Sequence, residues 1–161
     1  MKRRFILSLV GAVVLSSLQV PRAIADQVYH SERLDLWRTA EGRAAGHPNL
    51  RSGQVVNIHP NGPVNGALER YMINGAKPKT KYQVLIHAFS DLDCIGAPAL
   101  PDPIPTALLT TNAQGNAQGQ GYFSRADIDP FSGATLGVLW TLRDQNGVDA
   151  YQTDCTVVSI D

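Results

Sequence analysis

Histidine and aspartate are the first candidates for a functional site in this chain, because both can bind metals and transfer protons. The four histidines are His30, His47, His59 and His87. A zinc or copper site is often announced by H-x-H or, on a helix, by H-x-x-x-H, and neither spacing is present. The histidines therefore predict no metal site and no cofactor, and His87 is expected to be a partly covered strand residue.

Three aspartates follow His87 in one proline-rich stretch. Asp91, Asp93 and Asp102 belong to S-D-L-D-C-I-G-A-P-A-L-P-D-P-I-P, residues 90–105, which predicts a long ordered loop. Carboxylate oxygens suit calcium, but D-x-D is a common spacing and loop aspartates usually cap turns. We therefore interpret His87, Asp91, Asp93 and Asp102 as a candidate binding loop and assign no metal ligand.

No pattern in the sequence is typical of a catalytic site. The motif Gly-x-Ser-x-Gly is absent, and no glycine-rich phosphate loop precedes a helix. A pair of carboxylates for glycoside cleavage stays open because their separation is a three-dimensional quantity, although the only glutamates are Glu32, Glu41 and Glu69. The sequence therefore favours a binding protein over an enzyme, with no catalytic residue assigned.

Cys94 and Cys155 are the only cysteines. An even number of cysteines in an exported chain predicts a disulfide. A reactive thiol pair is the alternative, but there is no Cys-x-x-Cys spacing and no adjacent cation to lower a thiol pKa. The bridge would close a loop of about sixty residues, which the chain-entropy model values at up to roughly 4 kcal/mol.

The N-terminus has the pattern of a secretory signal peptide. A basic start, Lys2-Arg3-Arg4, is followed by an apolar run over 5–18 and a small-x-small site ending at Ala25. The run is too short for a membrane span, so cleavage after residue 25 would release a secreted or periplasmic chain without one. The remaining 161 minus 25, or 136, residues suffice for one domain.

Removing residues 1–25 changes the charge balance. The whole chain has 14 basic and 14 acidic side chains, and four of the basic ones lie in that segment. Ten basic side chains then face fourteen acidic ones. This mildly acidic balance disfavours a nucleic-acid partner.

His87 and the loop that follows it are carried by a strand predicted at Lys81–Phe89, where apolar and polar residues alternate. Gly75 and Pro78 interrupt the strand-like run before it. We therefore predict that the chain turns a corner here and passes from one sheet to another.

The segment Pro78-x-Thr80-x-Tyr82 resembles the tyrosine corner of immunoglobulin-like and fibronectin type III domains. In that family the tyrosine hydroxyl bonds to backbone a few residues upstream, so the resemblance implies a sandwich and the structural role of Pro78, Thr80 and Tyr82. It implies no activity. The chain departs from the family because about four predicted strands follow the corner, whereas two do in a standard domain.

The other predicted strands are arranged as hairpins. They are 54–58 with 67–73, 106–111 with 118–124 through a glycine-rich turn, and 134–142 with 151–160 through Asn146-Gly147. Residues 26–53 are predicted as an irregular segment that joins the domain, with Leu34, Leu36 and Trp37 open between strand and short helix. Residues 54–161 are then an all-β, two-sheet antiparallel immunoglobulin-like sandwich of about seven or eight strands, with a small barrel as the alternative.

These features lead to one main hypothesis about function and two rivals. We expect an exported module that binds an unidentified protein or glycan through loops or a sheet face. The first rival is a small secreted enzyme or enzyme inhibitor with a site near residues 87–105. The second is a structural subunit of a cell-surface assembly.

Overall fold

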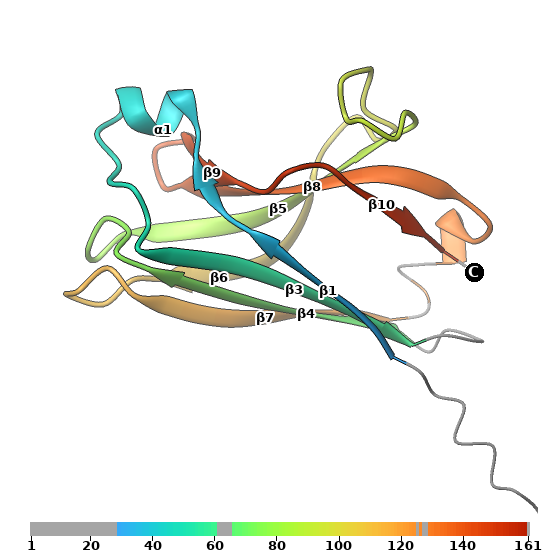
Figure 1. Ribbon diagram of the computed structural model, residues 1–161, viewed down its shortest axis with the longest axis horizontal. Coiled ribbons are helices and arrows are strands. Elements are labelled where there is room, and N and C mark those ends of the chain that lie inside the picture. Colours follow the sequence, from blue (N-terminus) through green and yellow to red (C-terminus); the bar gives the residue numbers. More distant parts are fainter. Residues whose placement is uncertain (1–28, 61–65, 125, 127–128, 161) are drawn as a thin grey trace, which may run out of the picture.

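Two antiparallel sheets pack face to face (Figure 1), which confirms the predicted all-β sandwich. The computed structural model describes residues 29–60, 66–124, 126 and 129–160. The predicted signal peptide lies outside the described residues, as does most of the turn predicted between the first two hairpin strands. In the described part of the chain, no helix is both long and apolar enough to cross a bilayer.

The strands divide unequally between the sheets. The four-stranded sheet has the order β1-β3-β4-β7, formed by β1 (Tyr29–Asp35), β3 (Ser52–Pro60), β4 (Gly66–Asn74) and β7 (Ala117–Ser124). The six-stranded sheet has the order β2-β9-β8-β5-β6, with β10 also paired to β8. Its strands are β2 (Trp37–Arg38), β5 (Lys81–Phe89), β6 (Ile104–Thr110), β8 (Thr135–Asp144), β9 (Asp149–Gln152) and β10 (Thr156–Ser159). Two short helices complete the fold, α1 (Ala40–Ala44) and the 3-10 turn η1 (Asp129–Phe131).

The irregular character predicted for residues 26–53 is wrong for most of their described part. β1 pairs with β3 along its whole length, and β2 pairs with β9. The segment around Leu36 is thus a strand that changes sheets, and Leu36 is buried where it crosses. The helix α1 follows, capped by Thr39, whose hydroxyl accepts a hydrogen bond from the Gly42 amide. β1 and β2 are strands because they pair with β3 and β9. The local sequence pattern carries no information about such pairing.

Two predicted hairpins are confirmed and one is wrong. β3 pairs with β4, and β8 pairs with β9 and β10, the last predicted strand being interrupted at 153–155. That interruption and the N-terminal strands bring the described residues to ten strands, against the seven or eight predicted. β6 and β7 do not pair, because β6 joins β5 in one sheet and β7 joins β4 in the other.

The predicted corner does carry the chain between sheets, from β4 to β5, and the turn after β6 carries it back. These two crossings bond to each other. The Thr111 hydroxyl donates to the Lys77 carbonyl at 2.7 Å, and the Ala76 amide donates to the Gly115 carbonyl at 2.9 Å. Gly115 has φ 77° and lies so close to the Ala76 carbonyl that a Cβ would clash. The glycine-rich turn is therefore a second corner between the sheets and not the tip of a hairpin.

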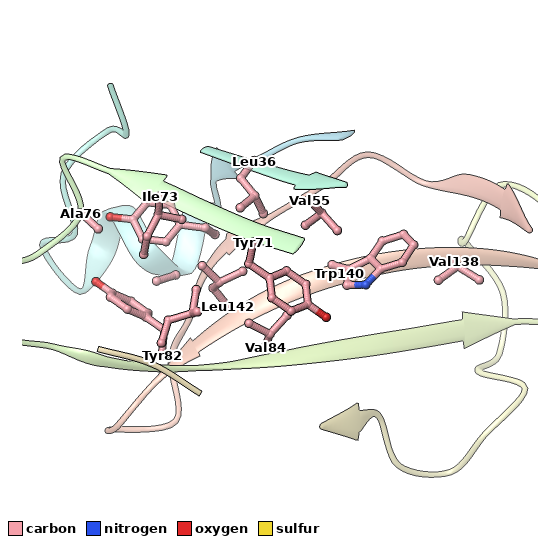
Figure 2. Close-up of a cluster of buried hydrophobic side chains, with 13 residues drawn as sticks. Leu36, Val55, Tyr71, Ile73, Ala76, Tyr82, Val84, Val138, Trp140 and Leu142 are labelled. Atoms are coloured by element: carbon pink, nitrogen blue, oxygen red, sulfur yellow. The ribbon is translucent and has the colours of Figure 1, made fainter. Parts of the chain in front are cut away.

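The core lies between the sheets, where apolar side chains of β3 and β4 meet those of β5 and β8 (Figure 2). The largest buried side chains of the core are Tyr71, Ile73, Tyr82, Leu109, Trp140, Leu142 and Tyr151. Alternation in β5 places Tyr82 and Val84 inward and leaves Gln83 exposed, as the sequence predicts. The interior therefore contains several tyrosine hydroxyls, each of which needs a polar partner.

His47 supplies the partner for Tyr82. Its Nδ1 lies 3.0 Å from the Tyr82 hydroxyl and its Nε2 lies 3.1 Å from Asp144 Oδ2, with the imidazole fully buried. Burial raises the pKa of Tyr82, while the backbone of Lys77 acts to lower it. The Tyr82 hydroxyl thus lies near the backbone of Lys77, as the resemblance to a tyrosine corner implies. The side chain that bonds to it, however, is His47 of the N-terminal segment. Tyr151 ties the same segment down by donating to the Pro48 carbonyl at 2.9 Å.

Asp144 also holds the turn between β8 and β9. Its Oδ1 accepts hydrogen bonds from the amides of Asn146 and Val148, at 2.8 and 3.0 Å. Burial acts to raise the pKa of Asp144, but these amide bonds and His47 outweigh it, so the pKa is lowered. One carboxylate therefore connects the C-terminal hairpin, the N-terminal segment and, through His47, the corner strand.

Replacing Tyr82 by phenylalanine tests the importance of this connection. The variant leaves a buried imidazole nitrogen without its partner, so we expect the free energy of unfolding to fall by about 1–3 kcal/mol. Urea denaturation measures the change. Gln83→Ala, at the exposed neighbouring position, should change it by less than about 0.5 kcal/mol. Equal stability of Tyr82→Phe and the parent would contradict the proposed role of the hydroxyl.

Candidate functional site

The four residues of the predicted binding loop do not form one cluster. His87 lies on the outer face of β5, half-buried, with Nε2 3.0 Å from the Thr141 hydroxyl. Burial lowers its pKa, with Asp149 opposing that effect and Arg143 adding to it. No interaction in the described part of the chain joins His87 to the three aspartates. It is a partly covered strand residue, as the sequence predicts.

Asp91 organises the loop that follows β5. Its carboxylate accepts hydrogen bonds from the amides of Ile95 and Gly96, at 3.0 and 2.8 Å. Desolvation acts to raise the pKa of Asp91, but Asp93 and these two amides have a larger effect in the opposite direction. The pKa of Asp91 is therefore lowered, and its carboxylate stays ionised. This is the turn-capping role expected for loop aspartates.

Asp93 lies near enough to Asp91 to affect its pKa, whereas Asp102 is exposed elsewhere in the loop. Among the described residues, no three histidine, cysteine, aspartate or glutamate side chains lie close enough together to hold a metal ion. The arrangement of Asp91, Asp93 and Asp102 thus gives the calcium alternative no support.

The disulfide between Cys94 and Cys155 is present, with a Cα–Cα distance of 5.9 Å, as predicted. It fastens the loop after β5 to the chain between β9 and β10. The loop also packs on Gly137 of β8, where a Cβ would clash with the Asp91 carbonyl and lie 3.2 Å from Cys94 Sγ. Further along, Pro98 forms an isolated bridge to Phe89, and the Ala99 amide donates to the Ala88 carbonyl at 2.8 Å. The loop is therefore fixed at several points.

Apolar side chains are exposed around this disulfide. Ile95 is 83% exposed, Leu92 is 52% exposed and Val157, two residues beyond Cys155, is 49% exposed. Val157 pairs with Gly137, over which the backbone of Leu92 lies. We call Leu92, Ile95 and Val157 the disulfide patch. It presents apolar surface at a rigid position, which suits contact with another macromolecule.

A second polar centre lies inside the sandwich, and sequence reasoning did not assign it a role. Glu69 is only 3% exposed and accepts a hydrogen bond from the Tyr71 hydroxyl, which is also 2.6 Å from Thr106 Oγ1. Burial raises the pKa of Glu69 to about 7, although the hydrogen bond from Tyr71 acts to lower it. The Trp140 indole nitrogen has no hydrogen-bond partner within the described part of the protein. Alternation in β4, which puts Glu69 on the same face as Tyr71 and Ile73, is the sequence signal for this burial.

Comparison with known proteins adds no identification: no family model, no curated protein and no solved structure matches the chain. The resemblance to immunoglobulin-like domains therefore stays a prediction. Function has to be argued from the surfaces of the molecule.

Glu69 generates a prediction about pH and stability. Its folded-state pKa of about 7 lies above the ordinary value of 4.5, so the folded state holds the proton more tightly. The resulting stabilisation is complete below pH 4.5 and is lost as pH rises to 7, up to roughly 3 kcal/mol in total. Glu69→Gln does not titrate, so its urea-unfolding free energy should decline less over this range than that of the parent. Identical pH profiles would contradict the assignment.

Gly137 generates a prediction about the loop. A methyl group in Gly137→Ala must push the Asp91–Cys94 segment off β8, so we expect a loss of about 1–3 kcal/mol in unfolding free energy. Thr135→Ala, at an exposed position of the same strand, is the control and should change it by less than about 0.5 kcal/mol. If the alanine variant at 137 is as stable as the parent, the loop does not rest on β8.

Proposed function

We propose that this protein is an exported binding module that holds a protein partner through its disulfide patch. The observation that carries the proposal is the exposure of Ile95 and Leu92 on a loop whose backbone is fixed. A side chain such as Ile95 gains about 1.5–3 kcal/mol when it moves from water into an apolar contact. Its exposure in the free molecule therefore favours association with a complementary surface.

The rigidity of the loop supports the same proposal. The Asp91 carboxylate, the Cys94–Cys155 bridge and the contact with Gly137 hold the backbone in one arrangement before any partner arrives. Binding then costs little conformational entropy, because the segment is already ordered. A mobile loop with the same side chains would lose part of its affinity to ordering.

Export is supported by two independent features of the chain. The N-terminal 25 residues have the basic, apolar and small-x-small sequence of a signal peptide. The disulfide is of the kind that persists in oxidising compartments, outside the cytosol. The site of action on this proposal is the periplasm or the cell exterior.

The rival hypothesis of an enzyme near residues 87–105 has weaker support from the geometry. The Asp91 carboxylate is occupied by two loop amides, and His87 bonds to Thr141, with no hydrogen bond between His87 and Asp91 among the described residues. A general base and its partner need to lie within hydrogen-bond reach of each other, and these residues do not. We therefore retain the binding module as the proposed function.

Photo-cross-linking in the producing cell tests the proposal. A benzoyl-phenylalanine placed at position 95 should give a discrete adduct with one protein outside the cytosol. The same probe at position 108 is the control, because Leu108 is 65% exposed on β6 but lies outside the disulfide patch. Ile95→Asp should reduce affinity for the captured protein at least about tenfold, and Leu108→Asp should not. Absence of an adduct at 95, or equal adducts at both positions, would contradict the proposal.

A further inference from the structure

A groove crosses the outer face of the four-stranded sheet, on a surface separate from the disulfide patch. Its volume is about 550 Å³, within the range typical of ligand sites. It is lined by outward-facing side chains of β3, β4 and β7, chiefly Gln54, Val56, Arg70, Met72, Gln118 and Gln120. The groove therefore combines one cation, several amides and an apolar floor.

The register of the sheet places these side chains in two neighbouring rows. Gln54, Met72 and Gln118 are cross-strand partners in one row, and Val56, Arg70 and Gln120 are partners in the next. Direct cross-strand neighbours on one face lie about 5 Å apart at Cβ. The Arg70 guanidinium is thus bordered by an apolar side chain on β3 and an amide on β7, with further amides in the adjoining row.

Arg70 differs from Arg33 and Arg143, each of which is paired with an aspartate. Arg33, on the same sheet face, is 3.6 Å from Asp35, and Arg143 bonds to Asp149 at 2.8 Å. No carboxylate or hydrogen-bond acceptor contacts the Arg70 side chain within the described residues, and the side chain is exposed. Its five N–H donors are therefore available to an anionic ligand in the groove.

The position of the groove restricts the class of ligand. β3 and β4 are both paired on each side, so their backbone groups are already hydrogen-bonded within the sheet. An extended peptide recognised by strand addition needs a free edge, which β3 and β4 do not offer; β7 has one, but only at the rim of the groove. A ligand in the middle of this face must be recognised by side chains alone. Nucleic acid is also an unsuitable ligand, because it needs several phosphate contacts and the groove offers one cation. The chain without its predicted signal peptide is, moreover, mildly acidic.

We propose that this groove binds an acidic polysaccharide, one whose sugar units carry carboxylates. A guanidinium binds a carboxylate through two parallel hydrogen bonds, which is the interaction that Arg70 can make. The glutamine amides both donate and accept, so Gln54, Gln118 and Gln120 match neighbouring sugar hydroxyls. The C–H face of a pyranose ring packs on Val56 and Met72. A neutral polysaccharide would leave the guanidinium unpaired and should bind more weakly.

Titration calorimetry with a soluble oligogalacturonate tests this inference on the protein in its naturally processed form, with dextran as the neutral comparison. We expect binding to the oligogalacturonate and at least about tenfold weaker binding to dextran. Arg70→Gln should weaken uronate binding at least about tenfold, and Arg70→Lys should be intermediate because it keeps the charge but loses the planar fork. Arg33→Gln removes a charge from the same face, on β1 beside Val56 but outside the groove lining, and should weaken binding far less than Arg70→Gln.

Several outcomes would overturn the inference. They are absence of uronate binding, equal affinity of Arg70→Gln and the parent, and an equal loss in Arg33→Gln, which would indicate nonspecific attraction. Doubling of the hydrodynamic mass in the parent but not in Arg70→Gln would show that a second copy of the chain covers this face instead. Ile95→Asp should bind the oligogalacturonate normally, so failure of this inference and failure of the proposed function are distinguishable.

Discussion

One buried histidine, His47, joins three parts of the fold through its hydrogen bonds to Tyr82 and Asp144. One imidazole, buried at the end of the sandwich, connects the N-terminal segment to the corner strand and to the C-terminal hairpin. Burying three polar side chains is costly unless each has a partner, and here each one satisfies another. This network therefore adds to the β1–β3 and β2–β9 pairings in holding the N-terminal segment against the sandwich.

The two crossings between sheets form the second constraint. The corner before β5 and the turn after β6 exchange hydrogen bonds, so neither is an isolated loop. Gly115 permits this contact because any side chain there would meet the Ala76 carbonyl. At the other polar centre, Glu69 lies between the sheets with Tyr71 and Thr106. The interior is thus held by polar networks as well as by apolar packing, and one of them changes charge near neutral pH.

The two candidate binding surfaces follow from how the sheets are covered. The outer face of the six-stranded sheet carries the loop after β5, which is fixed by a disulfide and presents Leu92 and Ile95. The groove crosses β3, β4 and β7 on the outer face of the four-stranded sheet, where Arg70 lies without a partner. The surfaces lie on opposite sheets of one rigid sandwich. A module of this kind could hold a protein by one surface and a polymer by the other.

Elements with a local signal can be predicted from the amino-acid sequence alone. Alternation located Lys81–Phe89 to the residue, Asn146-Gly147 marked the last hairpin turn, and the two cysteines indicated their own bridge. Features that depend on distant partners became visible only in the tertiary structure. They include the sheet that each strand joins, the strands at 29–35 and 37–38, and the contact of His47 with Tyr82 and Asp144. They also include the position of Arg70 in a groove and the separation of His87 from Asp91. The physical reason is that period-two patterning specifies which face of a strand is buried but carries no information about which strand will lie beside it.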